Sequence, residues 1–157
     1  MKKTISIIAP CFNERENIKL FYEKIKNIFQ NSIKNYDFEL IIVDDCSTDG
    51  SVEILKEISQ EDHNIKIVIN NRNYGAHRST FNVIKYANGD ALIPMLPVDM
   101  QDTPELIIDF VEKWEKGYDI VYGIKKKREE SFLSKSIRNF YYNIVNKISN
   151  IKIPPYV

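Results

Sequence analysis

Short apolar runs alternate along the chain with segments in which apolar residues recur at helical spacing. The apolar runs cover residues 5–9, 38–43, 65–69, 91–96 and 119–122. Continuous apolar runs of this length, bounded by turn residues, are typical of strands buried on both faces. We therefore predict five strands, the first of them ended by Pro10.

Between these runs, apolar residues recur three and four positions apart, as on one face of a helix. Asn13 is a candidate N-cap, and the predicted helix face that follows comprises Ile18, Phe21, Tyr22, Ile25, Ile28 and Phe29. The next face comprises Val52, Ile54, Leu55 and Ile58. Further helices are predicted over 76–87, closed by Asn88 and Gly89, over 104–116, and over 132–148.

Strand and helix alternate five times, and the strands are apolar runs without a polar face. This order predicts an α/β fold with three layers, in which helices cover both faces of a mainly parallel sheet. Length is compatible with one domain over residues 1–157. In such open sheets ligands bind beyond the carboxyl ends of the strands, so the residues directly after each strand are the first candidates for a site.

Charge and composition narrow the classes of function. The chain has 22 basic and 22 acidic side chains, and this balance argues against a nucleic-acid-binding protein. No apolar run reaches the roughly 20 residues of a membrane span. The two cysteines, Cys11 and Cys46, do not make a disulfide framework, so we expect a reduced, cytoplasmic protein.

Acidic and amide side chains follow the predicted strands. Carboxylate and amide oxygens at one sheet edge suit hard cations such as Mg²⁺ or Mn²⁺. The strand-end segments are 10–14, 44–50, 71–75 and 97–102, and the fifth run leads to the basic segment Lys125–Arg128. The sequence has no glycine-rich dinucleotide motif, no phosphate-binding loop of the Walker type and no zinc-ligand spacing.

Each of these segments also has an ordinary structural interpretation. Asp44 and Asp45 can cap the next helix, and Asp49 with Gly50 is typical of a turn. Cys11 and Cys46 fit small buried residues better than nucleophiles, since no histidine is paired with them. Lys125–Arg128 is by default a solvated run of charge. It is the ordered series of polar strand ends that favours a functional site.

Five segments resemble the inverting family 2 glycosyltransferases with the GT-A fold. Residues 10–18 (PCFNERENI) are similar to the opening motif of that family, and residues 41–51 (IIVDDCSTDGS) to its paired-aspartate motif. Residues 73–75 (NYG) and 99–107 (DMQDTPELI) resemble its third-helix loop and its metal-site region. Residues 117–123 (GYDIVYG), followed by basic residues, look most like the branch that glycosylates polyprenyl phosphates.

The resemblance implies a site for a nucleotide-diphosphate sugar and a divalent cation, Mg²⁺ or Mn²⁺. It implies Asp99 and Gln101 as cation ligands, and Asp99 and Arg128 as catalytic residues. The implied nucleotide-sugar contacts are Pro10, Phe12, Glu14, Val43, Asp45, Val98 and Asp99. The implied acceptor is a polyprenyl phosphate or a growing glycan, and the basic segment would hold phosphates or approach an anionic membrane surface at the inner face of the cell membrane.

The sequence departs from the family in two places. Pro97 stands where the first carboxylate of the family's Asp-x-Asp metal motif is expected, and proline supplies neither a ligand oxygen in its side chain nor a backbone N–H. The chain also stops at Val157, before the acceptor portion expected of the family. The alternative function is therefore a catalytically impaired module that binds a nucleotide sugar. A receiver-like signalling domain is a third class, disfavoured by the motif at 10–14.

Overall fold

The computed structural model describes residues 2–123, 141, 144, 145, 147 and 148. Contacts group residues 1–109, which carry the whole sheet, into one compact unit and residues 110–157 into another. The elements are β1 (Lys3–Cys11), α1 (Ile18–Asn27), the π-helical turn η1 (Ile28–Ser32), β2 (Tyr36–Asp44), α2 (Ser51–Glu61), β3 (Ile65–Ile69), α3 (Ala76–Val83), the 3-10 turn η2 (Ile84–Tyr86), β4 (Ala91–Ile93) and α4 (Leu106–Glu115).

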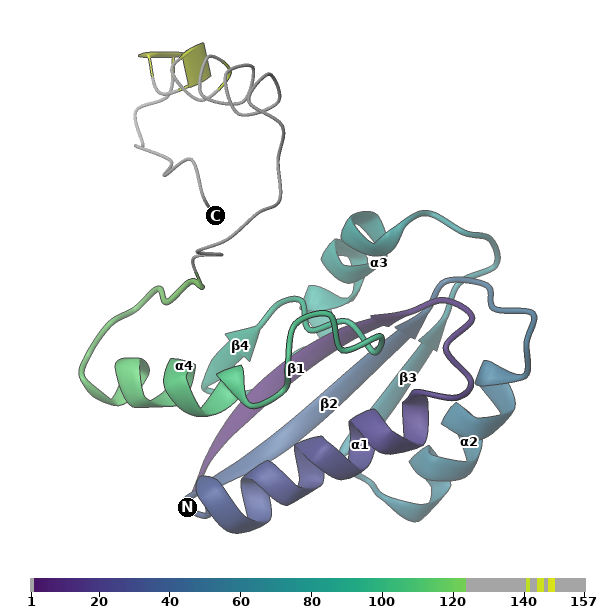
Figure 1. The fold of residues 1–157 in the computed structure, drawn as a ribbon, viewed down its shortest axis with the longest axis horizontal. Helices are drawn as coiled ribbons and strands as arrows, with labels where there is room; N and C mark the ends of the chain where they lie inside the picture. The colour runs from purple at the N-terminus through teal and green to yellow at the C-terminus, as the bar shows by residue number, and fades with distance from the viewer. Residues whose placement is uncertain (1, 124–140, 142–143, 146, 149–157) are drawn as a thin grey trace. The chain divides into compact units, whose positions relative to one another are not determined.

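The described strands form one parallel sheet in the order β3-β2-β1-β4 (Figure 1). Strands β1 and β2 pair along their full length, from Lys3 opposite Tyr36 to Cys11 opposite Asp44. Helices α1 and α2 cover one face of the sheet and α3 covers the other. The predicted three-layer α/β fold with a parallel sheet is confirmed.

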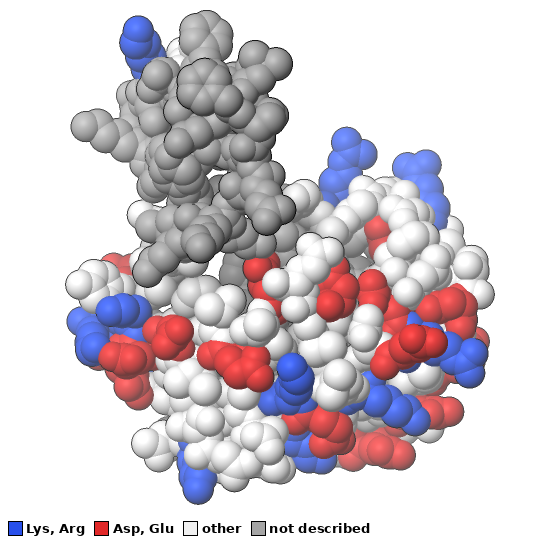
Figure 2. Space-filling model, viewed as in Figure 1, with Lys and Arg blue, Asp and Glu red and all other residues white. Residues whose placement is uncertain are grey.

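Apolar residues fill both faces of the sheet, which is why the strands read as continuous apolar runs. Ile8, Ile41 and Val43 pack with Val83 of α3 on one face. On the opposite face of the sheet, the predicted apolar face of α1 is buried, and it continues through the buried Ile28 and Phe29 of η1. In α2, Leu55 and Ile58 are buried while Val52 and Ile54 are half-buried. Acidic and basic side chains are interspersed over the surface seen in Figure 2.

Strand β1 does not end at Pro10, as predicted, but continues to Cys11. In a parallel sheet the N–H and C=O of one residue face the same neighbour. The carbonyl of Pro10 faces the segment after β4, where it accepts a hydrogen bond from the N–H of Val98 at 3.3 Å. The side of Pro10 that lacks an N–H therefore faces the segment after β4 and not β2. The regular pairing of β1 with β4 has already ended there, at Ile7 and Ile93, so the proline removes no hydrogen bond between paired strands.

Strand β4 is shorter than the predicted run 91–96, because Pro94 interrupts the run and Pro97 follows it. Pro94 and Pro97 have no N–H to donate, and the regular ladder stops at Ile93. Leu96, between them, still donates its N–H to the carbonyl of Ile8 at 2.9 Å. The chain thus stays beside β1 without continuing the strand.

The predicted fifth strand is wrong for the described residues, since 119–122 have no strand pairing there and Ile120 is 82% exposed. A run of four residues alone could not establish a pairing partner. The basic segment Lys125–Arg128 lies outside the described residues. Of the predicted helix 132–148, the described residues 141, 144, 145, 147 and 148 are helical. Within the described part of the chain, no helix combines the length and apolar character that crossing a membrane requires.

Two predicted helix caps are also wrong. Helix α1 begins at Ile18, and Asn13 instead has a left-handed backbone and accepts a hydrogen bond from the N–H of Thr48 at 2.9 Å. Asn88 and Gly89 follow η2 and donate their N–H groups to Glu39 Oε2 and Ser6 Oγ of the sheet, both at 2.9 Å, so Gly89 lies against the backbone of Ser6. A Cβ at Gly89 would come within 2.7 Å of the Ser6 nitrogen, so this position needs glycine for space.

A buried carboxylate, that of Glu39 on β2, ties three strands together. It accepts hydrogen bonds from Ser6 Oγ on β1 at 2.6 Å, from the Asn88 N–H at 2.9 Å and from Lys66 Nζ on β3. Burial raises the pKa of Glu39, but the hydrogen bonds from Lys66, Ser6 and Asn88 outweigh it and lower the pKa from 4.5 to about 2. The ionised form is therefore the one that the fold stabilises.

We predict that Glu39→Gln lowers the free energy of unfolding at pH 7 by about 2 kcal/mol, because Ser6, Lys66 and Asn88 lose a charged acceptor. A lowered pKa means that the contribution is fully present above pH 4.5 and is lost as the pH falls towards 2. Urea unfolding of both proteins at a series of pH values measures the difference. Glu57→Gln, at an exposed carboxylate paired with Lys19, is the matched control and should change stability far less. A pH-independent gap between Glu39→Gln and the parent chain would contradict the prediction.

Candidate functional site

The loops that follow β1 and β2 are bound together at the carboxyl edge of the sheet. Four hydrogen bonds between side chains and backbone N–H groups join residues 13–15 to residues 47–51. They run from Asn13 N–H to Ser47 Oγ at 2.8 Å, Glu14 N–H to Ser51 Oγ at 3.1 Å, Arg15 N–H to Asp49 Oδ2 at 3.0 Å, and Thr48 N–H to Asn13 Oδ1 at 2.9 Å. The side chains of Asn13, Ser47, Asp49 and Ser51 therefore hold the two loops together, whereas Glu14, Arg15 and Thr48 contribute only their backbone N–H groups to these four bonds.

Asp49 shows this bracing role most clearly. Its Oδ1 accepts hydrogen bonds from the backbone N–H and the hydroxyl of Ser51, at 3.0 and 2.6 Å, where α2 begins. Burial raises the pKa of Asp49, yet the hydrogen bonds from Ser51 and from the Arg15 N–H lower it overall. The interpretation of Asp49 and Gly50 as a turn and cap is confirmed, with Gly50 at a φ of 91°.

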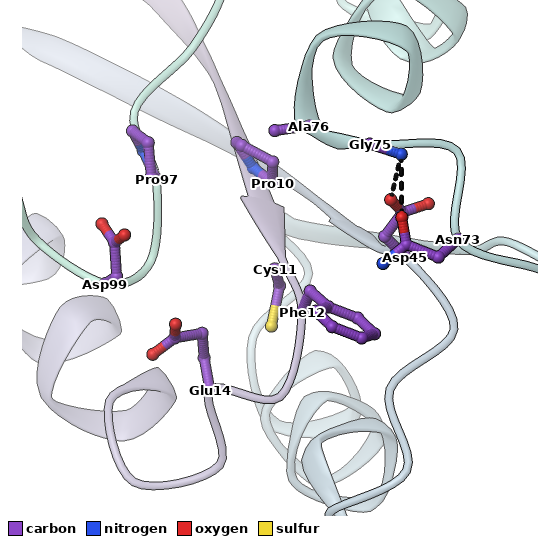
Figure 3. Close-up of a pocket in the computed structure, with 10 residues that line it drawn as sticks. All are labelled: Pro10, Cys11, Phe12, Glu14, Asp45, Asn73, Gly75, Ala76, Pro97 and Asp99. Atoms are coloured by element: carbon purple, nitrogen blue, oxygen red, sulfur yellow. Dashed lines mark hydrogen bonds between the residues drawn. The ribbon is translucent and has the colours of Figure 1, made fainter.

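Asp45 holds a third loop, the one between β3 and α3. Its carboxylate is 3% exposed and accepts five hydrogen bonds from that loop and from α3. The donors are the N–H of Tyr74 (3.0 and 3.1 Å, to both oxygens), the N–H of Gly75 (2.7 Å), Asn70 Nδ2 (2.8 Å) and Ser79 Oγ (2.8 Å). The carboxylate therefore fixes the backbone at residues 74–75, as Figure 3 shows for Gly75.

These donors also keep Asp45 charged. Burial raises the pKa of the carboxyl group, and the hydrogen bonds from Tyr74, Asn70, Ser79 and Gly75 together lower it below its ordinary value. Gly75 has a φ of 85°, a positive value that glycine adopts without strain. Charge on Asp45 and glycine at position 75 thus combine to set the course of the loop.

The three loops and the segment after β4 enclose a pocket of about 310 Å³, a size within the usual range of ligand sites. Its lining residues are Pro10, Cys11, Phe12, Glu14, Asp45, Asn73, Gly75, Ala76, Pro97 and Asp99. In Figure 3 the carboxylates of Glu14 and Asp99 lie on one side of Cys11 and the ring of Phe12 on the other. The pocket therefore offers an aromatic ring and acidic groups at separate places.

The structure brings together five of the residues that the sequence implied for the nucleotide sugar. Pro10, Phe12, Glu14, Asp45 and Asp99 all line this pocket. Val43 and Val98 do not line it, and both are fully buried. Gln101 lies next to it and donates its N–H to Asp99 Oδ1 at 3.1 Å, while Arg128 lies outside the described residues.

Sequence reasoning did not name Cys11, Asn73, Gly75 or Ala76 as site residues. The signal was present for three of them, because residues 73–76 follow a strand end and lead into a helix. Cys11 was expected to be a small buried residue, and it is 2% exposed. Burial, together with the negative charges of Asp44, Glu14 and Asp49, raises the pKa of its thiol to about 12. The thiol is therefore neutral and unsuited to act as a nucleophile.

The residues that line the pocket suit a divalent cation that is also bound by the phosphates of a substrate. Among residues 2–123 and the other described positions, no group of three or more His, Cys, Asp or Glu side chains is arranged to hold a metal ion. Pro97 lines the pocket close to Asp99 without a side-chain oxygen. Mg²⁺ is commonly held by one or two carboxylates plus the phosphates of a substrate. Asp99 supplies one such carboxylate, so the donor set suits a cation that arrives with a diphosphate.

Known proteins are similar to this chain in sequence or in fold. An uncharacterized glycosyltransferase, YkcC, of Bacillus subtilis is 37% identical over 95% of this chain and 46% of its own length. A prophage bactoprenol glucosyl transferase homolog of Escherichia coli is 33% identical over 95% of this chain and 48% of its own. The chain thus spans about half the length of the curated relatives it matches.

Among solved structures, the mannosyltransferase PcManGT of Pyrobaculum calidifontis, in complex with GDP-Man and Mn²⁺, aligns with a TM-score of 0.55 and 19% identity. The alignment covers 71% of this chain and 32% of that one, and it supports the expected GT-A fold. The family model described as glycosyl transferase family 2 matches residues 6–155, nearly the whole sequence. This chain therefore belongs to glycosyl transferase family 2.

Proposed function

We propose that the chain is the donor-binding part of an inverting glycosyltransferase. It would transfer a sugar from a nucleoside-diphosphate sugar to a polyprenyl phosphate or to a growing surface glycan. The observation that carries the proposal is the pocket at the carboxyl edge of the sheet, where Phe12, Asp99 and the loop held by Asp45 meet. Family membership and the bactoprenol glucosyl transferase relative support the reaction class and the acceptor.

The nucleoside would lie between Phe12 and the loop 73–76, with its diphosphate towards Asp99. Phe12 is 46% exposed, so its ring is available to stack against a base. The Asp45 carboxylate already accepts five hydrogen bonds, so we assign it the task of holding the loop. The backbone and side chain of Asn73 and the backbone of Ala76 would then contact the nucleoside.

In the reaction, an oxygen of the acceptor phosphate forms a bond to the anomeric carbon as the bond from that carbon to the nucleoside diphosphate breaks. The acceptor phosphate is already anionic, so no side chain has to remove a proton from it. Positioning of the two substrates and stabilisation of the leaving diphosphate then supply the rate. We assign acceptor or donor phosphate binding to Lys125–Arg128, with Arg128 as the bidentate contact.

A divalent cation would be held by Asp99 with Gln101 beside it, and it would offset the charge that develops on the leaving diphosphate. The Mn²⁺ in the PcManGT complex supports metal use in proteins of this fold. We expect the whole protein to act in the cytoplasm, at the inner face of the membrane that contains the acceptor.

A second candidate function is binding of a nucleotide sugar without efficient transfer. Pro97 favours it, because it lines the pocket beside Asp99 where the family motif is expected to place a second carboxylate. One carboxylate in place of two weakens the attraction for a divalent cation.

Pro97→Asp separates the two functions. We predict that it raises the apparent affinity for Mn²⁺ in the presence of uridine or guanosine diphosphate about ten-fold, because it adds an anionic ligand next to Asp99. Calorimetric titration measures affinity, and transfer to polyprenyl phosphate in membranes measures turnover. Pro94→Asp, at an exposed proline of the same segment, is the matched control and should change neither. Equal binding and turnover for Pro97→Asp and the parent chain would show that the missing acid has no effect.

Asp45→Asn tests the proposed role of the carboxylate in holding the loop. An amide cannot accept all five hydrogen bonds, so the loop 73–76 should lose its fixed course. We expect the affinity for the nucleoside diphosphate to fall about ten-fold or more, since hydrogen bonds to a charged group contribute roughly 1.5–3 kcal/mol.

Calorimetric titration measures this loss of affinity, and thermal unfolding reports stability in parallel. Asp37→Asn, at an exposed position of β2, removes the same charge and should leave affinity unchanged. Unaltered affinity in Asp45→Asn would contradict the assignment.

A further inference from the structure

The outward face of α3 combines basic and aromatic side chains. Ser79, Thr80 and Val83 turn towards the sheet and are buried. The opposite face carries Arg78, Phe81, Asn82 and, in η2, Lys85, at spacings of three, four and seven residues. Phe81 is 79% exposed and Tyr86 is 46% exposed. We call this set of five residues, with Arg72 and Tyr74 of the preceding loop, the α3 surface.

The α3 surface lies in a part of the sequence that has no acidic residue. Residues 63–89 contain neither Asp nor Glu, although the chain has 22 of each sign of charge overall. Lys66, within this stretch, is neutralised by Glu39. Within the described residues, Arg72, Arg78 and Lys85 form no ion pair, and the first and last of these lie over aromatic rings. Lys and Arg side chains project outward near α3 in Figure 2.

A second pocket, of about 520 Å³, lies in this surface between the end of β3 and α3. Its lining residues are Val68, Ile69, Asn70, Asn71, Tyr74, Arg78, Ser79 and Asn82. It shares no lining residue with the pocket of Figure 3. The guanidinium of Arg78 and the amides of Asn71 and Asn82 are donors that suit a phosphate group. Ile69, 46% exposed, adds an apolar edge.

We propose that the α3 surface docks onto an anionic phospholipid membrane, with a lipid phosphate in the pocket beside Arg78. Unpaired cations next to exposed aromatic rings match a layer of phosphates above an apolar interior, because each basic side chain gains energy near an anionic surface while the rings enter the interface. The absence of acidic groups from residues 63–89 removes the repulsion that such a surface would otherwise exert. This inference stands on the surface alone and does not depend on the proposed transferase activity.

The location has a consequence for the donor pocket. The loop 73–76, held by Asp45, forms one wall of that pocket and leads directly into α3. A membrane in contact with α3 would therefore lie next to the nucleotide-binding edge of the sheet. A membrane-bound acceptor phosphate would then be within reach of the same edge.

Sedimentation with lipid vesicles tests the proposal. The full chain should bind vesicles of phosphatidylcholine mixed with phosphatidylglycerol, and should bind pure phosphatidylcholine far more weakly. High salt should weaken the binding. Arg78→Ala combined with Lys85→Ala should reduce partitioning about 25-fold, on the basis of roughly five-fold per cation removed. Phe81→Ser should reduce it as well.

Matched controls lie on the other face of the sheet. Lys19→Ala combined with Lys56→Ala removes the same charge from α1 and α2, and Leu20→Ser removes a 52% exposed apolar side chain from α1. Both should bind as the parent chain does. Thermal unfolding and nucleoside-diphosphate titration of each variant show that the fold and the donor pocket are intact, so failure of donor binding is seen separately.

Three outcomes would overturn the proposal. The first is equal binding to vesicles with and without phosphatidylglycerol, or binding to neither. The second is an equal loss of binding in the α3 and control variants. The third is normal binding of the α3 variants together with complete loss when Lys125–Arg128 are replaced by alanine. That last result would assign membrane contact to the other basic segment.

Discussion

The candidate site depends on one buried carboxylate, that of Asp45, which accepts five hydrogen bonds from the loop between β3 and α3 and from Ser79 of α3, 25 or more residues further along the chain. The loop has no regular secondary structure of its own, so its backbone N–H groups need an acceptor. A carboxylate at the end of a central strand supplies it, and the strand itself is rigid because it pairs on both sides. The pocket wall is therefore as firmly placed as the sheet, although it is formed by a loop.

A similar device operates at the other end of the sheet. Glu39 accepts hydrogen bonds from Ser6, Asn88 and Lys66, much as Asp45 accepts them from its loop. Both carboxyl groups have lowered pKa values in spite of burial. The difference lies in what surrounds them. Glu39 lies among strands β1, β2 and β3, whereas Asp45 lines the pocket of Figure 3. The first carboxylate stabilises strands against one another, and the second shapes a place where a ligand can bind.

Much of the fold could be predicted because burial on both faces leaves a plain apolar pattern. Strand β2, which is buried from Phe38 to Asp44, and the buried helical face from Ile18 to Phe29 follow that pattern closely. Errors arose where hydrogen bonds with residues distant in the sequence decided the outcome. Asn13 is a residue type that often caps helices, but its side-chain oxygen instead accepts a hydrogen bond from the N–H of Thr48 in another loop. Residues 119–122 have the composition of a strand, but composition alone does not determine whether another strand lies beside them to pair with.

The site followed the same division. The motif residues Pro10, Phe12, Glu14, Asp45 and Asp99 could be placed at one edge because parallel strands end together. Which of them face the pocket and which brace loops depended on contacts that spacing does not show, and for that reason the buried Val43 and Val98 were grouped with them.

The prolines at positions 10 and 97 give the pocket a further property. Both line it, and each ring restricts its own backbone. Walls of this kind lose little conformational freedom when a ligand enters, so the entropic penalty of binding is small. The same stiffness makes the pocket selective by shape, because a ligand that is too broad at this point meets walls that have little room to adjust.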